Sequence, residues 1–471
     1  MTFFTDILNS LFCKQACFKA VYTYQKIKFR STSGIWSLFL KEIKTDVLII
    51  GAGLAGLSLA RHLEREYLII EKEDRPGGLA RTERSKEFHY DYTGHLLHLK
   101  NDYTREFIKE HLGDNLLEKG RNSWIFSNGV FTRYPFQKNT YGLPPQIIKE
   151  IIIGFLNRSE KKGWTFEDWV YSNFGEGIAK HFMIPYNYKL WTVPPSELTT
   201  DWQSGYVPKV TIEEIIDGAL SDNSDRVGYN ASFFYPERGG IEALVKAIQS
   251  KIDNSRILTG CESIEVDTDN KFVKTKEGMK IYYNNLVTTA PLKFFLQTLS
   301  SVPDSIKKYV LDLKYISVYN LNFAIRGERF KDKDWIYLPG QDFNCYRMGF
   351  PTNFSSCIAP SGYTTVYTEV SYSDRKRIDK SIIRKGIISD LIKIGLITDE
   401  KDIVEEKPLD IEVGYVLYDY NRKEAVKNLL LYLEGKAINS IGRYGAWEYS
   451  AMEDAILQGK TTADKLNYIG D

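Results

Sequence analysis

Three glycines near the start of the chain have the spacing of a dinucleotide-binding turn. They form the motif Gly51-Ala-Gly-Leu-Ala-Gly56, which follows the apolar run Asp46–Ile50 and precedes a helical pattern. Gly51 permits the tight turn, Gly53 lets a pyrophosphate approach the backbone, and Gly56 lets helix and strand pack closely. Glu71 ends a second apolar run twenty residues after Gly51, where a carboxylate accepts hydrogen bonds from ribose hydroxyls. Strand, helix and acid together predict a dinucleotide site.

Two further glycine motifs indicate which dinucleotide is bound. One follows Glu71 too closely to be another dinucleotide turn, and the other lies near the C-terminus. Both are similar to FAD contacts of the flavin amine-oxidase superfamily, so FAD is the expected cofactor, with the two ends of the chain closing over it. The expected FAD contacts in these motifs are Gly77, Gly78, Leu79, Ala80, Arg81, Gly442, Arg443 and Met452. The alternative interpretation is that these glycines only form turns and helix caps.

Several motifs in the middle of the chain carry a more specific resemblance. They are Asp91-Tyr-Thr-Gly94-His95, Tyr134-Pro-Phe-Gln137, Gly175 through Trp191, Asn230-Ala-Ser-Phe233, Ile325 through Arg329, Trp335-Ile-Tyr337 and Tyr346-Arg347. These stretches resemble the flavin-dependent UDP-galactopyranose mutases, especially those of eukaryotic type. The similarity covers about Lys44 to Leu466 and excludes the N-terminal extension.

The resemblance implies roles for individual residues. His95, behind Gly94, would lie against the flavin, and Arg347 would clamp a diphosphate, because a guanidinium matches phosphate oxygens with two parallel hydrogen bonds. The residues expected to hold the uridine are Tyr134, Gln137, Phe182, Met183, Asn187 and Trp191. The residues expected to line the sugar and diphosphate pocket are Tyr206, Asn230, Trp335, Tyr337, Tyr415 and Tyr449.

Each of these assignments has a structural alternative. Met183, Asn187 and Trp191 are spaced four apart, so on a helix they share one face. That face is either a ligand-binding face or a packed one, with Trp191 as a core residue. His95 would otherwise be a hydrogen-bonded structural histidine, and Arg347 an exposed strand residue.

The resemblance also implies a reaction. A UDP-hexopyranose, with UDP-galactose as the default, would interconvert with its furanose form through a flavin N5–sugar adduct. The reaction requires reduced FAD, so NADPH or NADH is the expected electron donor. The sequence has no second dinucleotide fingerprint for a dedicated nicotinamide site.

One position departs from the family pattern. Family members have a second diphosphate-binding arginine where Tyr206 stands in this chain. Loss of one charge-assisted contact costs about 1.5–3 kcal/mol of binding, and Lys209 is the nearest basic residue in the sequence. Two other functions stay open: an FAD-dependent oxidoreductase of the amine-oxidase superfamily, and a flavoprotein that binds a nucleotide sugar without turning it over.

Composition excludes several classes of partner. The 471 residues contain 62 Lys and Arg against 61 Asp and Glu, a formal charge of +1. Nucleic-acid and membrane-surface binding both require a basic excess, so neither is expected. The family resemblance implies a small-molecule nucleotide sugar as the partner. The chain has no apolar run of about 20 residues for a membrane span. Homo-oligomers are compatible with the sequence.

Cysteine and histidine usage indicates the cellular location and bears on metal binding. The five Cys are scattered and include no CxxC pair, which favours a reducing, cytoplasmic location. His95 and His98 lie three apart without a surrounding cluster of Cys or carboxylates, so no metal site is expected.

The pattern of apolar residues predicts the elements that position these motifs. We expect an α/β fold, α+β overall: a Rossmann-type FAD-binding domain with an inserted helical substrate domain and an antiparallel β-sheet domain. A mostly helical stretch is expected over 101–222, a small β-meander over 261–291, an antiparallel sheet within 305–375, and a closing strand at 437–441. The expected boundaries are an extension of unknown role over 1–44, FAD-binding parts over 45–130, 223–300 and 411–471, the helical domain over 131–222, and the sheet domain over 301–410.

Overall fold

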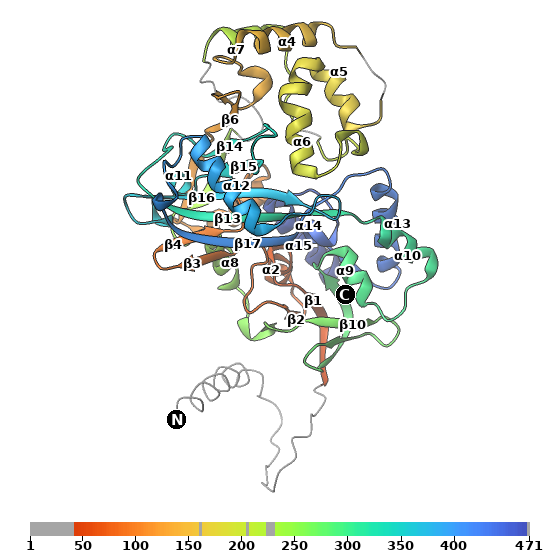
Figure 1. The fold of residues 1–471 in the computed structure, drawn as a ribbon. Coiled ribbons are helices and arrows are strands. Elements are labelled where there is room, and N and C mark those ends of the chain that lie inside the picture. Colours follow the sequence, from red (N-terminus) through yellow and green to blue (C-terminus); the bar gives the residue numbers. More distant parts are fainter. Residues whose placement is uncertain (1–41, 160–162, 204–206, 223–230, 469–471) are drawn as a thin grey trace.

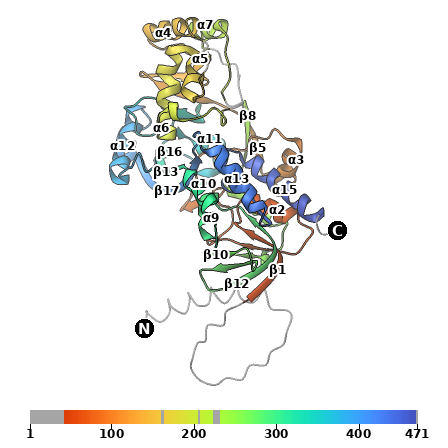
Figure 2. The same cartoon turned by 90° about the vertical axis from the view of Figure 1, so that its right-hand side faces the viewer.

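Two seven-stranded sheets organise the computed structural model, which describes residues 42–159, 163–203, 207–222 and 231–468. A group of helices stands at one end of the molecule, the second sheet lies in the middle, and the first sheet lies at the other end (Figures 1 and 2). Of the extension expected over 1–44, residues 1–41 lie outside the described residues, and residues 42–44 begin the first strand.

The first sheet is the Rossmann-type sheet that the glycine motif predicts. Its strand order is β10-β11-β12-β1-β2-β9, with β18 beside β12. The parallel strands are β1 (Glu42–Ile50), β2 (Tyr67–Ile70), β9 (Ile257–Leu258), β12 (Lys280–Thr288) and β18 (Ile438–Ser440). Antiparallel β10 (Ser263–Asp267) and β11 (Phe272–Thr275) extend β12. This confirms the β-meander and the closing strand that the sequence predicts.

Burial explains why the second half of β1 is an unbroken run of apolar residues. Val47, Leu48 and Ile49 are fully buried, as expected of a strand that has parallel neighbours and is covered on both faces. Helices α2 (Leu54–His62) and α15 (Met452–Tyr468) pack against each other. The N-terminal and C-terminal parts of the described chain therefore lie together beside the β1–α2 turn.

The second sheet is built from strands far apart in the sequence. Its order is β17 (Ile403–Val416), β13 (Tyr315–Arg326), β16 (Tyr363–Tyr372), β15 (Arg347–Gly349), β14 (Trp335–Tyr337), β6 (Ser123–Ser127) and β7 (Val130–Arg133). All neighbours are antiparallel except β14 and β6. The predicted antiparallel sheet is confirmed, but β6 and β7 join it from within the stretch expected to be mostly helical. Such short strands show little periodicity, so the sequence did not indicate them.

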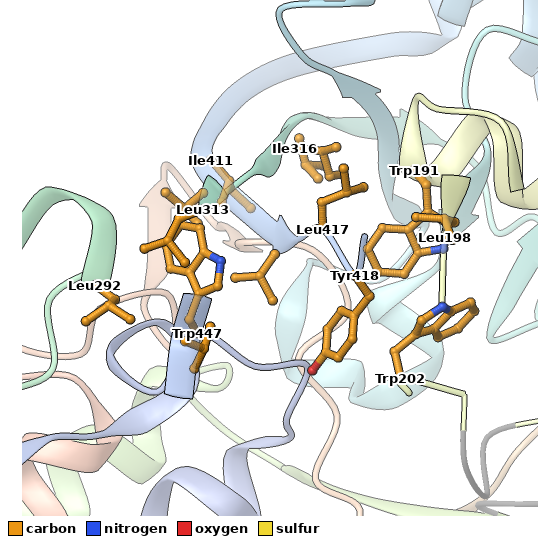
Figure 3. Packing of buried hydrophobic residues seen from close by; sticks show 14 of the residues in the cluster. Trp191, Leu198, Trp202, Leu292, Leu313, Ile316, Ile411, Leu417, Tyr418 and Trp447 are labelled. Carbon is orange, nitrogen blue, oxygen red and sulfur yellow. The ribbon is translucent and has the colours of Figure 1, made fainter. Parts of the chain in front are cut away.

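The helical part consists of α4 (Pro145–Leu156), α5 (Phe166–Ile178), a π-helical turn (Ala179–Met183), α6 (Ile184–Trp191) and α7 (Ile212–Leu220). Where this part meets the second sheet, Trp191, Leu198 and Trp202 pack together in the core (Figure 3). Helix α6 is thereby held next to the strands that carry Tyr337 and Arg347.

The remaining elements connect these layers. They are β3 (Thr82–Ser85), β4 (Phe88–Asp91), α3 (Asp102–Leu112), β5 (Leu116–Gly120), β8 (Ser232–Pro236), α8 (Glu242–Gln249), α9 (Leu292–Thr298), α10 (Asp304–Asp312), α11 (Pro351–Phe354), α12 (Lys380–Lys393), α13 (Arg422–Glu434) and α14 (Gly442–Gly445). None of the helices described is both long and apolar enough to cross a lipid bilayer.

Candidate functional site

The β1–α2 turn exposes its backbone to a large cavity. Gly51 has a φ of +99°, and its N–H donates to the carbonyl oxygen of Ile70 at 2.8 Å, which ties the turn to β2. A Cβ added to Gly53 would meet no atom within 4 Å. Gly53 is also the N-cap of α2, and no side chain caps the helix. The first amides of α2 are therefore open to an anion, as phosphate binding requires.

Glu71 lies beside this turn, at the end of β2. Its Oε2 accepts a hydrogen bond from the N–H of Ala52 at 2.8 Å, and its Oε1 accepts one from the N–H of Glu73 at 3.0 Å. Each carboxylate oxygen has a further acceptor position, and the side chain lines the cavity. The position fits a carboxylate that binds ribose hydroxyls.

The second glycine motif packs against the first. The N–H of Gly77 donates to the carbonyl oxygen of Ala52 at 2.9 Å. A Cβ added to Gly78 would lie 3.4 Å from the Cα of Gly53. Arg81 is buried, and its guanidinium lies 3.5 Å from the carboxylate of Glu73. The two turns form one cradle, whose backbone leaves room for the phosphates of a dinucleotide, so these residues fit FAD.

His95 faces the same cavity from the segment after β4. Burial, followed by the positive charge of Arg443, lowers its pKa to about 4, so the imidazole is neutral near pH 7. Its Nδ1 is buried without a hydrogen-bond partner among the described residues. Tyr367 of β16 packs so closely that a Cβ added to Gly94 would lie 2.4 Å from its hydroxyl oxygen. His95 therefore has one unused nitrogen for a ligand.

An aromatic wall forms the end of the cavity next to α6. The ring of Phe182 lies nearly parallel to those of Phe136 and Tyr186, with ring centroids 5.1 and 5.4 Å away. The ring of Tyr337 lies 5.4 Å from Tyr186 and 5.1 Å from Tyr134. Flat faces of this kind suit the ring of a nucleobase.

Two amides lie beside this aromatic wall. Gln137 donates through Nε2 to the carbonyl oxygen of Pro208 at 2.9 Å, which leaves its buried Oε1 without a partner among the described residues. Asn187 donates through Nδ2 to the carbonyl oxygen of Met183 at 2.8 Å. Each amide is thus held through its NH₂ group. The carbonyl oxygen of Gln137 stays available to a donor such as an imide N–H.

Trp191 does not line the cavity. It is fully buried, and its ring packs against Trp202, Tyr415 and Tyr449, with centroids 5.1, 5.8 and 6.4 Å away. Figure 3 shows it side by side with Trp202 in the core. Any effect of Trp191 on a ligand would pass through Trp202, Tyr415 and Tyr449, which do line the cavity.

Arg347 is paired within the protein. Its Nε and Nη2 donate to the two carboxylate oxygens of Glu369 at 2.9 and 2.8 Å, across neighbouring strands β15 and β16. Burial opposes the charge, but the carboxylate outweighs it, so the pKa of Arg347 lies well above its usual range. The guanidinium is thus an oriented cation at the border of the cavity, and not the exposed strand residue of the alternative interpretation.

Arg443 provides a second cation. Its guanidinium lies 5.2 Å from the ring centroid of Tyr415 and 5.0 Å from that of Tyr449, two rings that stack on each other. It donates to the carbonyl oxygen of Ser450. Within the described parts of the chain it forms no ion pair with a carboxylate. An anion in the cavity would therefore meet more positive charge than Arg347 alone supplies.

The two glycine turns, Glu71, His95, the two amides and both arginines border one cavity of about 1380 Å³. Single-ligand pockets usually measure about 300–1,000 Å³, so this cavity is larger than one such ligand requires. The expected residues that line it are Gly51, Gly53, Glu71, Gly77, Gly78, Leu79, Ala80, Arg81, Gly94, His95, Tyr134, Gln137, Phe182, Met183, Asn187, Trp335, Tyr337, Arg347, Tyr415, Gly442, Arg443, Tyr449 and Met452. Gly56 instead packs beneath the turn, and Tyr206 and Asn230 lie outside the described residues.

The lining also includes residues that were not among the expected ones, and three of them are of interest for ligand binding. Tyr186 and Tyr367 border the cavity, and Arg121 does so with its guanidinium 4.5 Å from the ring centroid of Tyr134. Tyr186 directly precedes Asn187, so its place in the motif was a usable signal. Arg121 and Tyr367 stand in segments without any spacing signal. Among the described residues, no group of three or more His, Cys, Asp or Glu side chains could hold a metal ion.

Comparisons with known protein sequences match the nucleotide-binding part. Residues 49–111 match the family described as the NAD(P)-binding Rossmann-like domain. The L-amino-acid oxidase of Crotalus adamanteus is 32% identical over 102 residues, and apoxin-1 of Crotalus atrox matches equally. These matches span 21% of this chain and 20% of the oxidases.

Solved structures match nearly the whole chain. A reduced UDP-galactopyranose mutase superposes with a TM-score of 0.86 and 27% identity, covering 90% of this chain and 96% of the mutase. A putative protoporphyrinogen oxidase from Exiguobacterium has a TM-score of 0.71 at 14% identity, covering 92% and 100%. Cyclohexylamine oxidase from Brevibacterium oxydans has 0.65 at 15%, covering 90% and 99%. At such identities the two oxidases share the fold only.

Fold and cradle together define a flavoenzyme of the FAD-binding, amine-oxidase-like class. Within that class, the resemblance to the UDP-galactopyranose mutase family is confirmed, because the mutase superposes over 90% of this chain with a TM-score of 0.86.

Proposed function

We propose that this protein is a nucleotide-sugar mutase that interconverts a UDP-hexopyranose, with UDP-galactose as the default, and its furanose form on reduced FAD. The observation that carries the proposal is the single cavity, which runs from the glycine cradle to the aromatic wall beside α6. An oxidase of a small amine has no need of a base-sized aromatic wall next to a paired arginine. The similarity to a reduced UDP-galactopyranose mutase supports the same choice.

In the proposed reaction, the protein binds the base and the diphosphate of the substrate and leaves the reacting carbon of the sugar free. Phe182, Gln137 and Asn187 bind the base, and Arg347 binds the diphosphate. Arg443 adds positive charge that offsets the missing arginine at Tyr206. Because Glu369 fixes the Arg347 guanidinium, a released diphosphate stays oriented for recapture, which is a positioning contribution to rate.

The cofactor supplies the chemistry that side chains cannot: nucleophilic and redox reactivity at its isoalloxazine ring. Neutral His95 borders the cavity, and its buried Nδ1 has no hydrogen-bond partner among the described residues. We propose NADPH or NADH as the reductant and the cytoplasm as the location.

The test is turnover with and without reduction. Purified protein is incubated with UDP-galactopyranose with or without dithionite, and the products are separated by anion-exchange chromatography. A new UDP-hexose peak only in the reduced sample is expected. Replacement of Arg347 by Met should abolish it, whereas Arg375→Met, at an exposed arginine paired with Glu197, should not. No product and no effect of UDP on the flavin spectrum would refute the mutase function.

A second candidate is an FAD-dependent amine or amino-acid oxidase. The 32% identity to L-amino-acid oxidases over 102 residues favours it, although that match is confined to about a fifth of each chain. Such an enzyme would release hydrogen peroxide from an amino acid or amine in air, and UDP would leave its activity unchanged.

A further inference from the structure

Lys189 is a buried lysine of α6 that faces away from the cavity. Its side chain is 4% exposed, and it is not among the residues that line the cavity. Asn187, two residues earlier on the same helix, does line it. Residues two apart on a helix point in nearly opposite directions, so one helix presents Asn187 to the cavity and Lys189 to the structure behind it.

The ammonium of Lys189 is fully used by three carbonyl oxygens. It donates to Leu338 and Cys345 at 2.8 Å and to Gly340 at 2.9 Å. An ammonium has three N–H donors, so none remains for another partner. These carbonyls all belong to the connection between β14, which ends at Tyr337, and β15, which begins at Arg347.

A carboxylate holds the same connection from its other side. Asp390 of α12 is 2% exposed. Its Oδ2 accepts from the N–H of Asn344 at 2.7 Å and of Cys345 at 3.1 Å, and its Oδ1 accepts from Asn344 Nδ2 at 3.1 Å. The connection 338–346 is thus fixed between a cation on α6 and an anion on α12.

We propose that Lys189 is a positioning residue that sets the separation between the base-binding face of α6 and the anion-binding Arg347. The inference rests on the proposed function, because it assumes a ligand that spans both. Two weakly bound groups joined by a linker gain affinity only when their subsites are held at the matching distance. The three hydrogen bonds of Lys189 would therefore favour a ligand in which a ribose joins the base to the phosphates.

The measurable consequence is a ratio of affinities. Uridine occupies only the base subsite, whereas UDP occupies both. In the FAD-loaded wild-type protein, UDP should bind at least about 100-fold more tightly than uridine. In Lys189→Met, which keeps the length of the side chain without its donors, that ratio should fall by about tenfold or more. Uridine affinity itself should stay within about twofold.

Lys393→Met is the matched control. Lys393 pairs with Asp342 of the same connection from α12, but it is 41% exposed, so its loss should leave the ratio unchanged. Titration calorimetry gives each dissociation constant. A folded Lys189→Met variant with an unchanged ratio, or with uridine and UDP weakened equally, overturns the inference.

The wild-type protein offers a second readout that does not depend on folding of the variant. Burial lowers the pKa of Lys189 to about 8; Cys345, Asp390, Lys376 and Lys393 are the other groups that act on it. The phosphates of UDP, with a second pKa of about 6, are fully ionised above about pH 7. As pH rises from about 7 to about 9.5, the ammonium is lost and the ratio should fall.

Both ligands contain uracil, so ionisation of the uracil changes both affinities alike and leaves their ratio unchanged. A ratio that stays flat over this pH range overturns the inference. Wild-type protein that binds no UDP refutes the nucleotide-sugar function and the role of Lys189 together. Tight UDP binding with an unchanged ratio in the variant refutes the role of Lys189 alone.

Discussion

Replacing Gly53 or Gly56 by alanine adds one methyl group in each case, but the two variants should differ in what they impair. A Cβ at Gly53 would meet no atom within 4 Å, and its φ of −73° is available to alanine. A Cβ at Gly56 would lie 2.1 Å from the carbonyl oxygen of Gly51 and 3.2 Å from its carbonyl carbon. Gly53→Ala should therefore affect the cofactor, and Gly56→Ala should affect the fold.

The magnitudes follow from these distances. The new methyl of Gly53→Ala reaches about 1.5 Å from Cα into the space for the phosphates. Losing one charge-assisted hydrogen bond costs about 1.5–3 kcal/mol, so FAD affinity should fall about 10- to 150-fold. Stability without FAD should stay within about 0.5 kcal/mol. In Gly56→Ala the overlap is with backbone, which side-chain rotation cannot relieve, so unfolding free energy should fall by about 1–3 kcal/mol or more.

Both quantities can be measured on the same preparations. After flavin removal, FAD is titrated back with flavin fluorescence as the signal, and urea unfolding is followed without FAD. Wild-type FAD affinity in Gly53→Ala would show that the phosphates do not pass over this residue. Wild-type stability in Gly56→Ala would refute the packing argument for the turn.

Three further predictions concern residues that line the cavity or pack behind its lining. Glu369→Gln leaves Arg347 without its carboxylate and should lower the unfolding free energy in urea by about 3–5 kcal/mol; an unchanged midpoint would contradict this. Burial lowers the pKa of His98 from 6.5 to about 4. Between these values the unfolded chain binds a proton that the native state does not, so stability should fall as pH drops through this window, by up to about 3 kcal/mol. His98→Asn should reduce this loss of stability at low pH, measured by urea unfolding at several pH values. An identical pH dependence in variant and wild type would show that His98 is not its origin. Trp191→Ala removes a fully buried ring and should cost about 3–5 kcal/mol in urea unfolding; a cost below about 1 kcal/mol would place the ring outside the core.

Much of the cofactor site could be predicted from the sequence because its determinants are local. A phosphate that touches the backbone needs small residues at fixed spacing, and Gly51, Gly53, Gly77 and Gly78 all border the cavity. The side chains that segment 179–191 contributes to the cavity lining could also be predicted, since the residues of one helix are close in sequence. Arg121 and Tyr367 were missed because nothing near them in the sequence marks them, and only sheet pairing brings them to the cavity.

The sequence by itself determined the glycine cradle, the acid after β2 and the residue types on α6, because each depends on contacts within a few residues. The tertiary structure decided which of those side chains border the cavity. Trp191 shares a helix with Asn187, yet it is in the core because Trp202 and Tyr415 cover it. Arg347 is an oriented cation because the register of β15 against β16 places Glu369 opposite it. Such pairings join segments far apart in the chain, and only the burial of whole sheets fixes their register.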